Sequence, residues 1–71
     1  MMPLSLIGSG ESAMVRRVGG SPEMKSHLED MGFVAGSEVN VVSSLGGNLI
    51  VTIKGVRVAI GNDMASKIMV G

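Results

Sequence analysis

The stretch SPEMKSHLEDMGF, residues 21–33, carries the signals that begin and end one short helix. Ser21 can accept hydrogen bonds from the first free backbone N–H groups, and Pro22 suits the first helical position, where no N–H is needed. Gly32 stands where a residue with positive φ closes a helix, and Phe33 after it can fold back onto the last turn. These residues predict a helix that begins at Pro22 and ends before Gly32.

This helix is expected to be amphipathic. At about 100° per residue, apolar and polar side chains separate onto opposite faces. The apolar face holds Met24, Leu28 and Met31, and the polar face holds Glu23, Ser26, His27 and Asp30. An isolated helix of roughly ten residues is marginal in water, so the apolar face must pack against the rest of the chain.

The rest of the chain has the pattern of strands, because apolar and polar residues alternate along it. About five strands are expected, over residues 12–18, 38–41, 49–54, 56–60 and 68–70. The alternation over residues 12–18 is blurred, so the inward face of that strand stays open. Leu4 and Leu6 are expected to tuck against the domain.

Two hairpins follow from the alternation. If Lys54-Gly55 forms a two-residue loop, the core-facing pairs are Ile53 with Val56, Val51 with Val58, and Leu49 with Ile60. In the preceding hairpin, a three-residue loop over residues 46–48 would pair Leu45 with Leu49 and Val41 with Ile53 on the same side. We expect this odd-numbered loop, because an even-numbered one would turn the apolar set outward.

Short strands with tight turns cannot leave an apolar sheet face open. The predicted fold class is therefore mainly β with one short inserted helix, a small SH3-like, partly open β-barrel of about five strands with the helix at one end. The predicted core consists of Met24, Leu28, Met31, Phe33, Val39, Val41, Leu49, Val51, Ile53, Val56, Val58, Ile60 and Ile68.

The composition excludes several classes of function. Six Lys and Arg balance six Asp and Glu, and Phe33 is the one aromatic residue, which argues against nucleic-acid binding. Without cysteine, the chain has no disulfide framework and no thiolate metal site. No apolar run approaches the roughly 20 residues of a membrane span, and no leader pattern is found. We expect one soluble, cytoplasmic domain over residues 1–71.

Catalytic and cofactor signatures are missing from the sequence. The chain has one His, and its small hydroxyl residues stand in turns, which is a weak basis for a nucleophile and base pair. The glycines of residues 8–10 and 46–47 fit neither the Walker A spacing nor the dinucleotide fingerprint. We expect no enzyme activity and no cofactor.

Two groups of residues are candidates for binding. Glu23, His27 and Asp30 share the polar helix face, where one imidazole and two carboxylates could hold a divalent metal, although a solvated helix face gives the same pattern. In the second hairpin, Ile50 and Ala59 face each other on the outward side, flanked by Thr52 and Arg57. An outward apolar pair among polar neighbours is a candidate docking site for a protein partner, although single exposed apolar residues are normal.

The stretch LEDMGFVAGSEVNV, residues 28–41, resembles the ferrous-iron transport protein A (FeoA) family. Members are similar to Leu-x-x-Met-Gly-Leu-x-Pro-Gly-x-x-Val-x-Val in this region. The matching positions are Leu28, Met31, Gly32, Gly36, Val39 and Val41, and the departures are Phe33 and Ala35. An alternating hairpin with Gly55 at its tip and a closing ASKIMV, residues 65–70, extend the resemblance over nearly the whole chain.

The resemblance implies an SH3-like domain that serves as a small cytosolic accessory of ferrous iron transport. Its implied partner is the membrane-bound transporter FeoB, whose N-terminal part is a G-protein domain. A similar domain closes the DtxR-type iron-dependent repressors, so a metal-sensing or metal-binding module is the alternative. The single aromatic residue, Phe33, is used at the helix end, so an aromatic groove for PxxP ligands is not expected.

Overall fold

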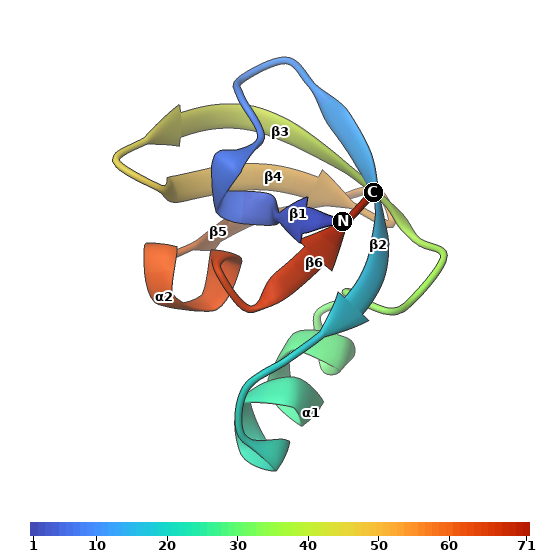
Figure 1. Cartoon of the computed structure of the whole chain (residues 1–71). Helices are drawn as coiled ribbons and strands as arrows, with labels where there is room; N and C mark the ends of the chain where they lie inside the picture. Colours follow the sequence, from blue (N-terminus) through green and yellow to red (C-terminus); the bar gives the residue numbers. More distant parts are fainter.

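The computed structural model describes residues 1–71 (Figure 1). In chain order the elements are β1 (Met2–Pro3), the 3-10 helix η1 (Leu4–Leu6), β2 (Ser12–Val18), α1 (Pro22–Asp30), β3 (Glu38–Leu45), β4 (Asn48–Ile53), β5 (Val56–Ile60), α2 (Asn62–Ala65) and β6 (Ile68–Val70). The predicted mainly β fold with one inserted helix is confirmed. The structure has six strands where about five were predicted. The strand that was not predicted is β1, whose two residues are too few to show an alternating pattern.

The strands form one curled sheet in the order β1-β6-β2-β3-β4-β5, and every neighbouring pair is antiparallel. The two ends of this order, β1 and β5, are not paired with each other, so hydrogen bonds do not close the barrel. The barrel is therefore partly open, as predicted. The first and last residues of the chain lie side by side in Figure 1, because β1 pairs with β6.

Strand β2 joins the two halves of the sheet. Its first residues, Ser12 to Met14, pair with β3, and the stretch from Val15 to Val18 pairs with β6. The register shifts between Val15 and Arg17, so one residue is added where the strand bends. This irregularity explains the blurred alternation of the sequence. Val15 and Val18 are buried, which settles the inward face of the strand.

Helix α1 begins as its sequence predicts. The Met24 N–H donates to the Ser21 hydroxyl over 3.2 Å, and Pro22 occupies the first helical position. Leu28 is fully buried, whereas Met24 and Met31 are partly buried against the core. The helix lies at one end of the sheet, beyond β2 (Figure 1). No helix of the structure is long and apolar enough to cross a membrane.

The end of α1 is a Schellman motif. The Phe33 N–H donates to the Leu28 carbonyl over 3.0 Å, and the Gly32 N–H donates to the Glu29 carbonyl over 3.0 Å. Gly32 has a φ of 108°, which confirms the predicted positive φ. Phe33 is fully buried and belongs to the same core cluster as Leu28.

The β4–β5 hairpin has the predicted register. The two loop residues, Lys54 and Gly55, have φ values of 51° and 77°, as in a type I′ turn. Ile53 pairs with Val56, Val51 with Val58, and Leu49 with Ile60. The prediction that Val56 is a core residue is wrong, because its side chain is 60% exposed. Val56 stands next to the turn on a strand at the edge of the sheet, so nothing covers it on its second side.

The predicted three-residue loop between β3 and β4 is wrong. The loop is Gly46-Gly47, with Leu45 paired to Asn48, and Val41 pairs with Val51 rather than Ile53. A β-bulge between Val41 and Ser43 adds one residue to β3, and this shift compensates for the even-numbered loop. Val39 and Val41 therefore still face the core, whereas Leu45 is 84% exposed.

One hydrophobic core fills the barrel. Its buried members are Leu4, Val15, Val18, Leu28, Phe33, Val39, Val41, Leu49, Val51, Ile53, Ile60, Ala65, Ile68 and Val70. Of the predicted core, Met24, Met31 and Val58 are only partly buried. Leu4 packs in the core as expected, whereas Leu6 is exposed. No side-chain nitrogen or oxygen atom is buried without a partner.

Candidate functional site

The outward face of the β3–β4–β5 sheet holds the four residues predicted to dock a partner. Ile50 pairs with Ala59, and Thr52 pairs with Arg57. Ile50 is 39% exposed, and Ala59 and Arg57 are exposed as well, whereas Thr52 is partly covered. The structure thus brings these four side chains together on one face, in the register that the sequence predicts.

Two further apolar residues join this face because of the β-bulge. Val42 is the added residue of β3, so Val42 and Ser43 both stand opposite Ile50. Leu45 lies two pairs further along, opposite Asn48, and points outward. We call the exposed residues Val42, Leu45, Ile50 and Ala59 the apolar patch. The doublet Val41-Val42 interrupts the alternation of β3, and it is the one sequence signal that could have revealed the bulge.

A shallow groove of about 450 Å³ runs from the apolar patch to the edge of the sheet. Five of its eight lining residues are apolar, namely Leu45, Leu49, Ile50, Ala59 and Ile60. Its walls come from β3, β4 and β5, and it ends at Gly61 before α2. The side-chain oxygen of Asn48 accepts a hydrogen bond from the Asn62 N–H over 2.9 Å, which fixes the start of α2 beside this groove.

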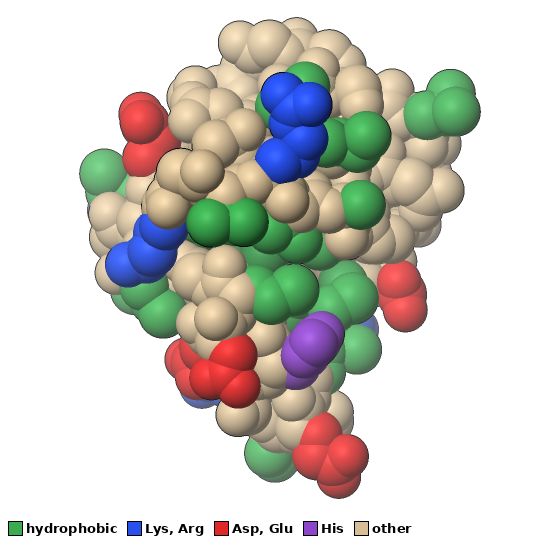
Figure 2. Space-filling model, turned by 180° about the vertical axis from the view of Figure 1, so that it is seen from behind, with side chains coloured by type: hydrophobic (Ala, Val, Ile, Leu, Met, Phe, Trp, Pro, Cys, Tyr) green, Lys and Arg blue, Asp and Glu red, His purple; other side chains and the backbone are tan.

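The charged residues of the β4–β5 hairpin are both basic. Residues 48–60 contain Lys54 and Arg57 and no acidic residue. Both side chains are exposed, and neither takes part in the side-chain hydrogen bonds of the protein. The outward face therefore combines an apolar patch with two basic side chains that make no hydrogen bond with another side chain, and Glu38 at the start of β3 is the one acidic residue of the strands. Figure 2 shows basic and apolar side chains side by side on one face of the molecule.

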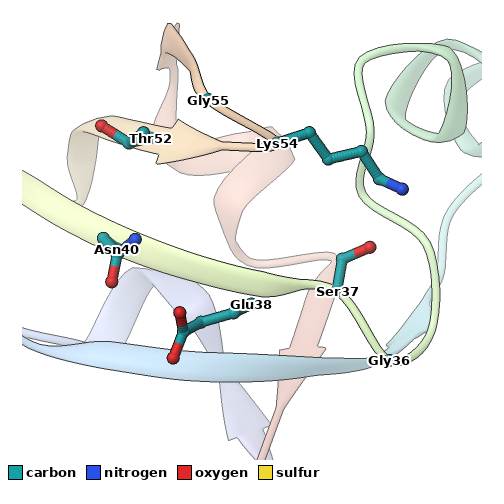
Figure 3. Close-up of a pocket in the computed structure, with 7 residues that line it drawn as sticks. All are labelled: Gly36, Ser37, Glu38, Asn40, Thr52, Lys54 and Gly55. Carbon is teal, nitrogen blue, oxygen red and sulfur yellow. The ribbon is translucent and has the colours of Figure 1, made fainter.

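A second, polar hollow of about 460 Å³ lies near the β4–β5 turn (Figure 3). It is lined by Gly36, Ser37, Glu38, Asn40, Thr52, Lys54 and Gly55, none of them apolar. The side chains do not converge, because Lys54 extends away from Glu38 and Asn40. The Lys54 stem runs along the end of α1, where its Cδ would be 3.4 Å from a Cβ added to Gly32. The hollow therefore offers no set of converging side chains to a ligand.

The helix residues predicted as weak metal candidates do not form a ligand set. Glu23, His27 and Asp30 are all exposed on α1. No group of three or more His, Cys, Asp or Glu side chains in the structure could hold a metal ion. In Figure 2 the one histidine lies apart from the acidic side chains visible on that face. A solvated polar helix face, the other interpretation of this pattern, describes what the structure shows.

The residues that carry the family resemblance have structural places. Leu28, Val39 and Val41 are buried in the core, and Met31 is the C-cap residue of α1. The glycines Gly32, Gly36 and Gly55 all have positive φ. The buried motif residues pack in the core, and the motif glycines form the end of the helix and the turns that follow it. The motif therefore specifies the fold rather than a reactive site.

Comparison with known proteins gives a consistent family assignment. Residues 2–71 match the model of the FeoA domain. A protein of Methanocaldococcus jannaschii, named as a candidate Fe(2+) transport protein A, is 34% identical over 70 residues, which cover 99% of this chain and 85% of that protein. The crystal structure of Stenotrophomonas maltophilia FeoA complexed with zinc is 28% identical, with a TM-score of 0.87 over 100% of this chain and 91% of that one.

The comparison also confirms the predicted fold. The Stenotrophomonas protein is described as a prokaryotic SH3 domain protein. A manganese-dependent transcriptional repressor is 23% identical, with a TM-score of 0.90 over 99% of this chain and 40% of the repressor chain. At this identity the repressor shows the shared fold alone. The match to the FeoA domain model, by contrast, spans nearly the whole sequence. The chain therefore belongs to the FeoA domain family.

Proposed function

We propose that the protein is a small cytoplasmic accessory of ferrous iron transport, which acts by contact with a FeoB-type membrane transporter, a protein that carries a G-protein domain. Family membership and the 34% identical relative, named for Fe(2+) transport, support a role in iron transport. The Stenotrophomonas protein is described as a candidate activating factor of ferrous iron transport, which fits an accessory role.

The observation that carries this proposal is the apolar patch of Val42, Leu45, Ile50 and Ala59. Contiguous apolar side chains on the surface of a small protein are typical of protein–protein interfaces. Interfaces take most of their binding energy from a few residues near the centre of the contact. Ile50 has this central position, because it lies between β3 and β5 and pairs with Ala59.

A metal-binding module, like the one suggested by the repressor resemblance, is the second candidate. Its only ligand residues would be Glu23, His27 and Asp30, which are exposed and do not form a cluster. A divalent ion needs a first shell of converging nitrogen or oxygen ligands, and these three side chains do not supply one. An accessory that acts by contact does not need to carry the ion. We therefore propose the contact role, without enzyme activity.

The test is recovery of the transporter by the tagged protein from cells grown in iron-limited, low-oxygen medium. The wild type is expected to recover the transporter. Ile50→Glu places a charge in the apolar patch and should fold normally but lose recovery by at least tenfold. The control is Leu6→Glu, which adds the same charge to an exposed apolar residue of η1, outside the patch. If the wild type recovers no transporter, the proposed function is wrong; if Ile50→Glu recovers as much as the wild type, the patch is not the contact.

A further inference from the structure

The two edges of the sheet are unequal. Strand β1 has two residues, Met2 and Pro3, and proline has no N–H to offer an added strand. Strand β5 is five residues long, from Val56 to Ile60, and contains neither a proline nor a bulge. Proteins commonly protect long sheet edges with such features. Of the two edge strands, β5 is therefore the one to which another strand could add.

The hydrogen-bond pattern of the hairpin decides which backbone groups are free. In a two-residue hairpin the residues beside the loop, Ile53 and Val56, exchange hydrogen bonds, and such pairs alternate with pairs that do not. Val56, Val58 and Ile60 thus bond to β4. The N–H and C=O groups of Arg57 and Ala59 point away from β4, towards solvent. These four groups have the spacing that an added strand requires.

The side chains around this edge define what kind of strand would fit. The apolar groove lies directly beside it, lined by Ile50, Ala59 and Ile60, and suits an apolar side chain. Arg57 on β5 and Lys54 at the β4–β5 turn supply two positive charges near the other end of this strand. The one acidic residue of the strands is Glu38 on β3, which β4 separates from the β5 edge. An apolar side chain and a carboxylate on an extended segment would satisfy both features.

We propose that the edge of β5 accepts an extended acidic segment of a partner protein, which adds to the sheet as a further strand. This inference rests on the contact role proposed above and adds the mode of contact and the chemistry of the partner. Backbone hydrogen bonds to Arg57 and Ala59 hold the segment in this type of recognition, and the groove and the basic residues select it. Apolar side chains of the segment enter the groove, and its carboxylates lie near Lys54 and Arg57.

A second copy of the chain is a poorer occupant of this edge. Pairing of β5 with β5 of a second copy would place both Arg57 side chains on one sheet, without an acidic residue of β4 or β5 to balance them. Like charges on one face of a sheet weaken pairing. Charge complementarity therefore favours an acidic segment of a different protein.

The probe is a capped octapeptide, Val-Thr-Val-Thr-Glu-Thr-Glu-Thr, whose valines and glutamates share one face of an extended strand, as Ala59 and Arg57 share one face of β5. Its control carries lysine in place of each glutamate. Nuclear magnetic resonance of the isotope-labelled protein measures binding and the hydrogen exchange of single amides. We expect the glutamate peptide to bind at least tenfold more tightly than the lysine peptide at low salt, and this ratio to fall as salt is added. The amides of Arg57 and Ala59 should exchange at least fivefold more slowly in the complex.

Two variants separate the backbone contact from the charge. Ala59→Pro removes one edge N–H that makes no bond to β4, so it should weaken peptide binding at least tenfold. Ala59→Ser changes the same side chain but keeps the N–H, so it should weaken binding by less than Ala59→Pro does. Arg57→Gln should reduce the preference for the glutamate peptide. The dispersion of the amide spectrum shows whether Ala59→Pro folds. If it does not fold, Arg57→Gln alone tests the proposal.

The outcomes distinguish this inference from the proposed function. Equal binding of the two peptides, no binding of either, or binding that leaves the amides of Arg57 and Ala59 unchanged would overturn strand addition of an acidic segment. Protection of these amides at high protein concentration without peptide would identify a second copy as the occupant and also overturn it. If Ala59→Pro recovers the transporter as well as the wild type does, the β5 edge is not the site of contact, but the proposed contact role remains. A wild type that binds the peptide but recovers no transporter would overturn the contact role alone.

Discussion

Replacing Gly32 by valine should destabilise the protein through the backbone rather than through crowding. Gly32 has a φ of 108°, and its N–H closes the last turn of α1. A Cβ at this position would meet Lys54 Cδ at 3.4 Å and Ile53 Cγ1 at 3.7 Å, which are ordinary van der Waals contacts. The space is therefore available, and the unfavourable energy comes from the left-handed conformation.

That energy can be worked out from the conformation. An L-residue in the left-handed region costs about 1–2 kcal/mol, and a β-branched residue is a stronger outlier there. We expect Gly32→Ala to lower the free energy of unfolding by about 1 kcal/mol and Gly32→Val by about 2 kcal/mol. In a domain of roughly 60–100 residues, 1 kcal/mol corresponds to a Tm change of roughly 4–8 °C, so the valine variant should melt roughly 8–16 °C lower.

Urea unfolding followed by circular dichroism measures these differences, with the slope m expected to stay constant. The control is Gly19→Ala, at a glycine without positive φ whose added Cβ would meet only the Lys67 carbonyl oxygen at 3.5 Å. This control should change the free energy of unfolding by no more than about 0.5 kcal/mol. An unchanged midpoint for Gly32→Val would show that α1 does not depend on a left-handed residue at its end.

Three further predictions test the core, the register and the metal. Leu28→Ala and Val51→Ala should each lower the free energy of unfolding by about 2–4 kcal/mol in thermal or urea unfolding, because both side chains are fully buried, and wild-type stability would show that the wrong face is assigned to the core. Leu45→Asp should change the free energy of unfolding by less than about 0.5 kcal/mol, because Leu45 is 84% exposed in the bulged register. A large loss of stability would instead support the three-residue loop, in which Leu45 faces the core. Anaerobic titration calorimetry should detect weak or no binding of ferrous iron, and a micromolar site that disappears in His27→Ala would favour the metal-binding module.

Local signals in the sequence predict the helix and one hairpin correctly. The caps of α1 act through neighbouring backbone groups, so Ser21, Pro22 and Gly32 specify the helix without knowledge of the rest of the fold. The β4–β5 loop has two residues, with a glycine at its second position, and this length sets the register of the hairpin. In both cases the residues that decide the structure are close together in the chain.

The remaining features depend on distant parts of the chain. The bulge at Val42 and the two-residue loop each shift the register by one, so their effects cancel in the alternation and the sequence pattern favours the wrong pair. The exposure of Val56 depends on β5 being an edge strand, which only the strand order shows. The docking pair Ile50 and Ala59 was accessible from the sequence, whereas Val42 and Leu45 required the true register.

The position of β6 affects the order in which the protein can fold in the cell. This last strand lies between β1 and β2, the two strands made first. Until residues 68–70 emerge from the ribosome, the half of β2 from Val15 to Val18 has no partner on that side, and β1 has none at all. The nascent chain can form α1 and the β3–β4–β5 hairpins, but it cannot complete the barrel. Completion of the barrel thus waits for residues 68–70, and their loss would leave β1 and the Val15–Val18 half of β2 without a partner strand on that side.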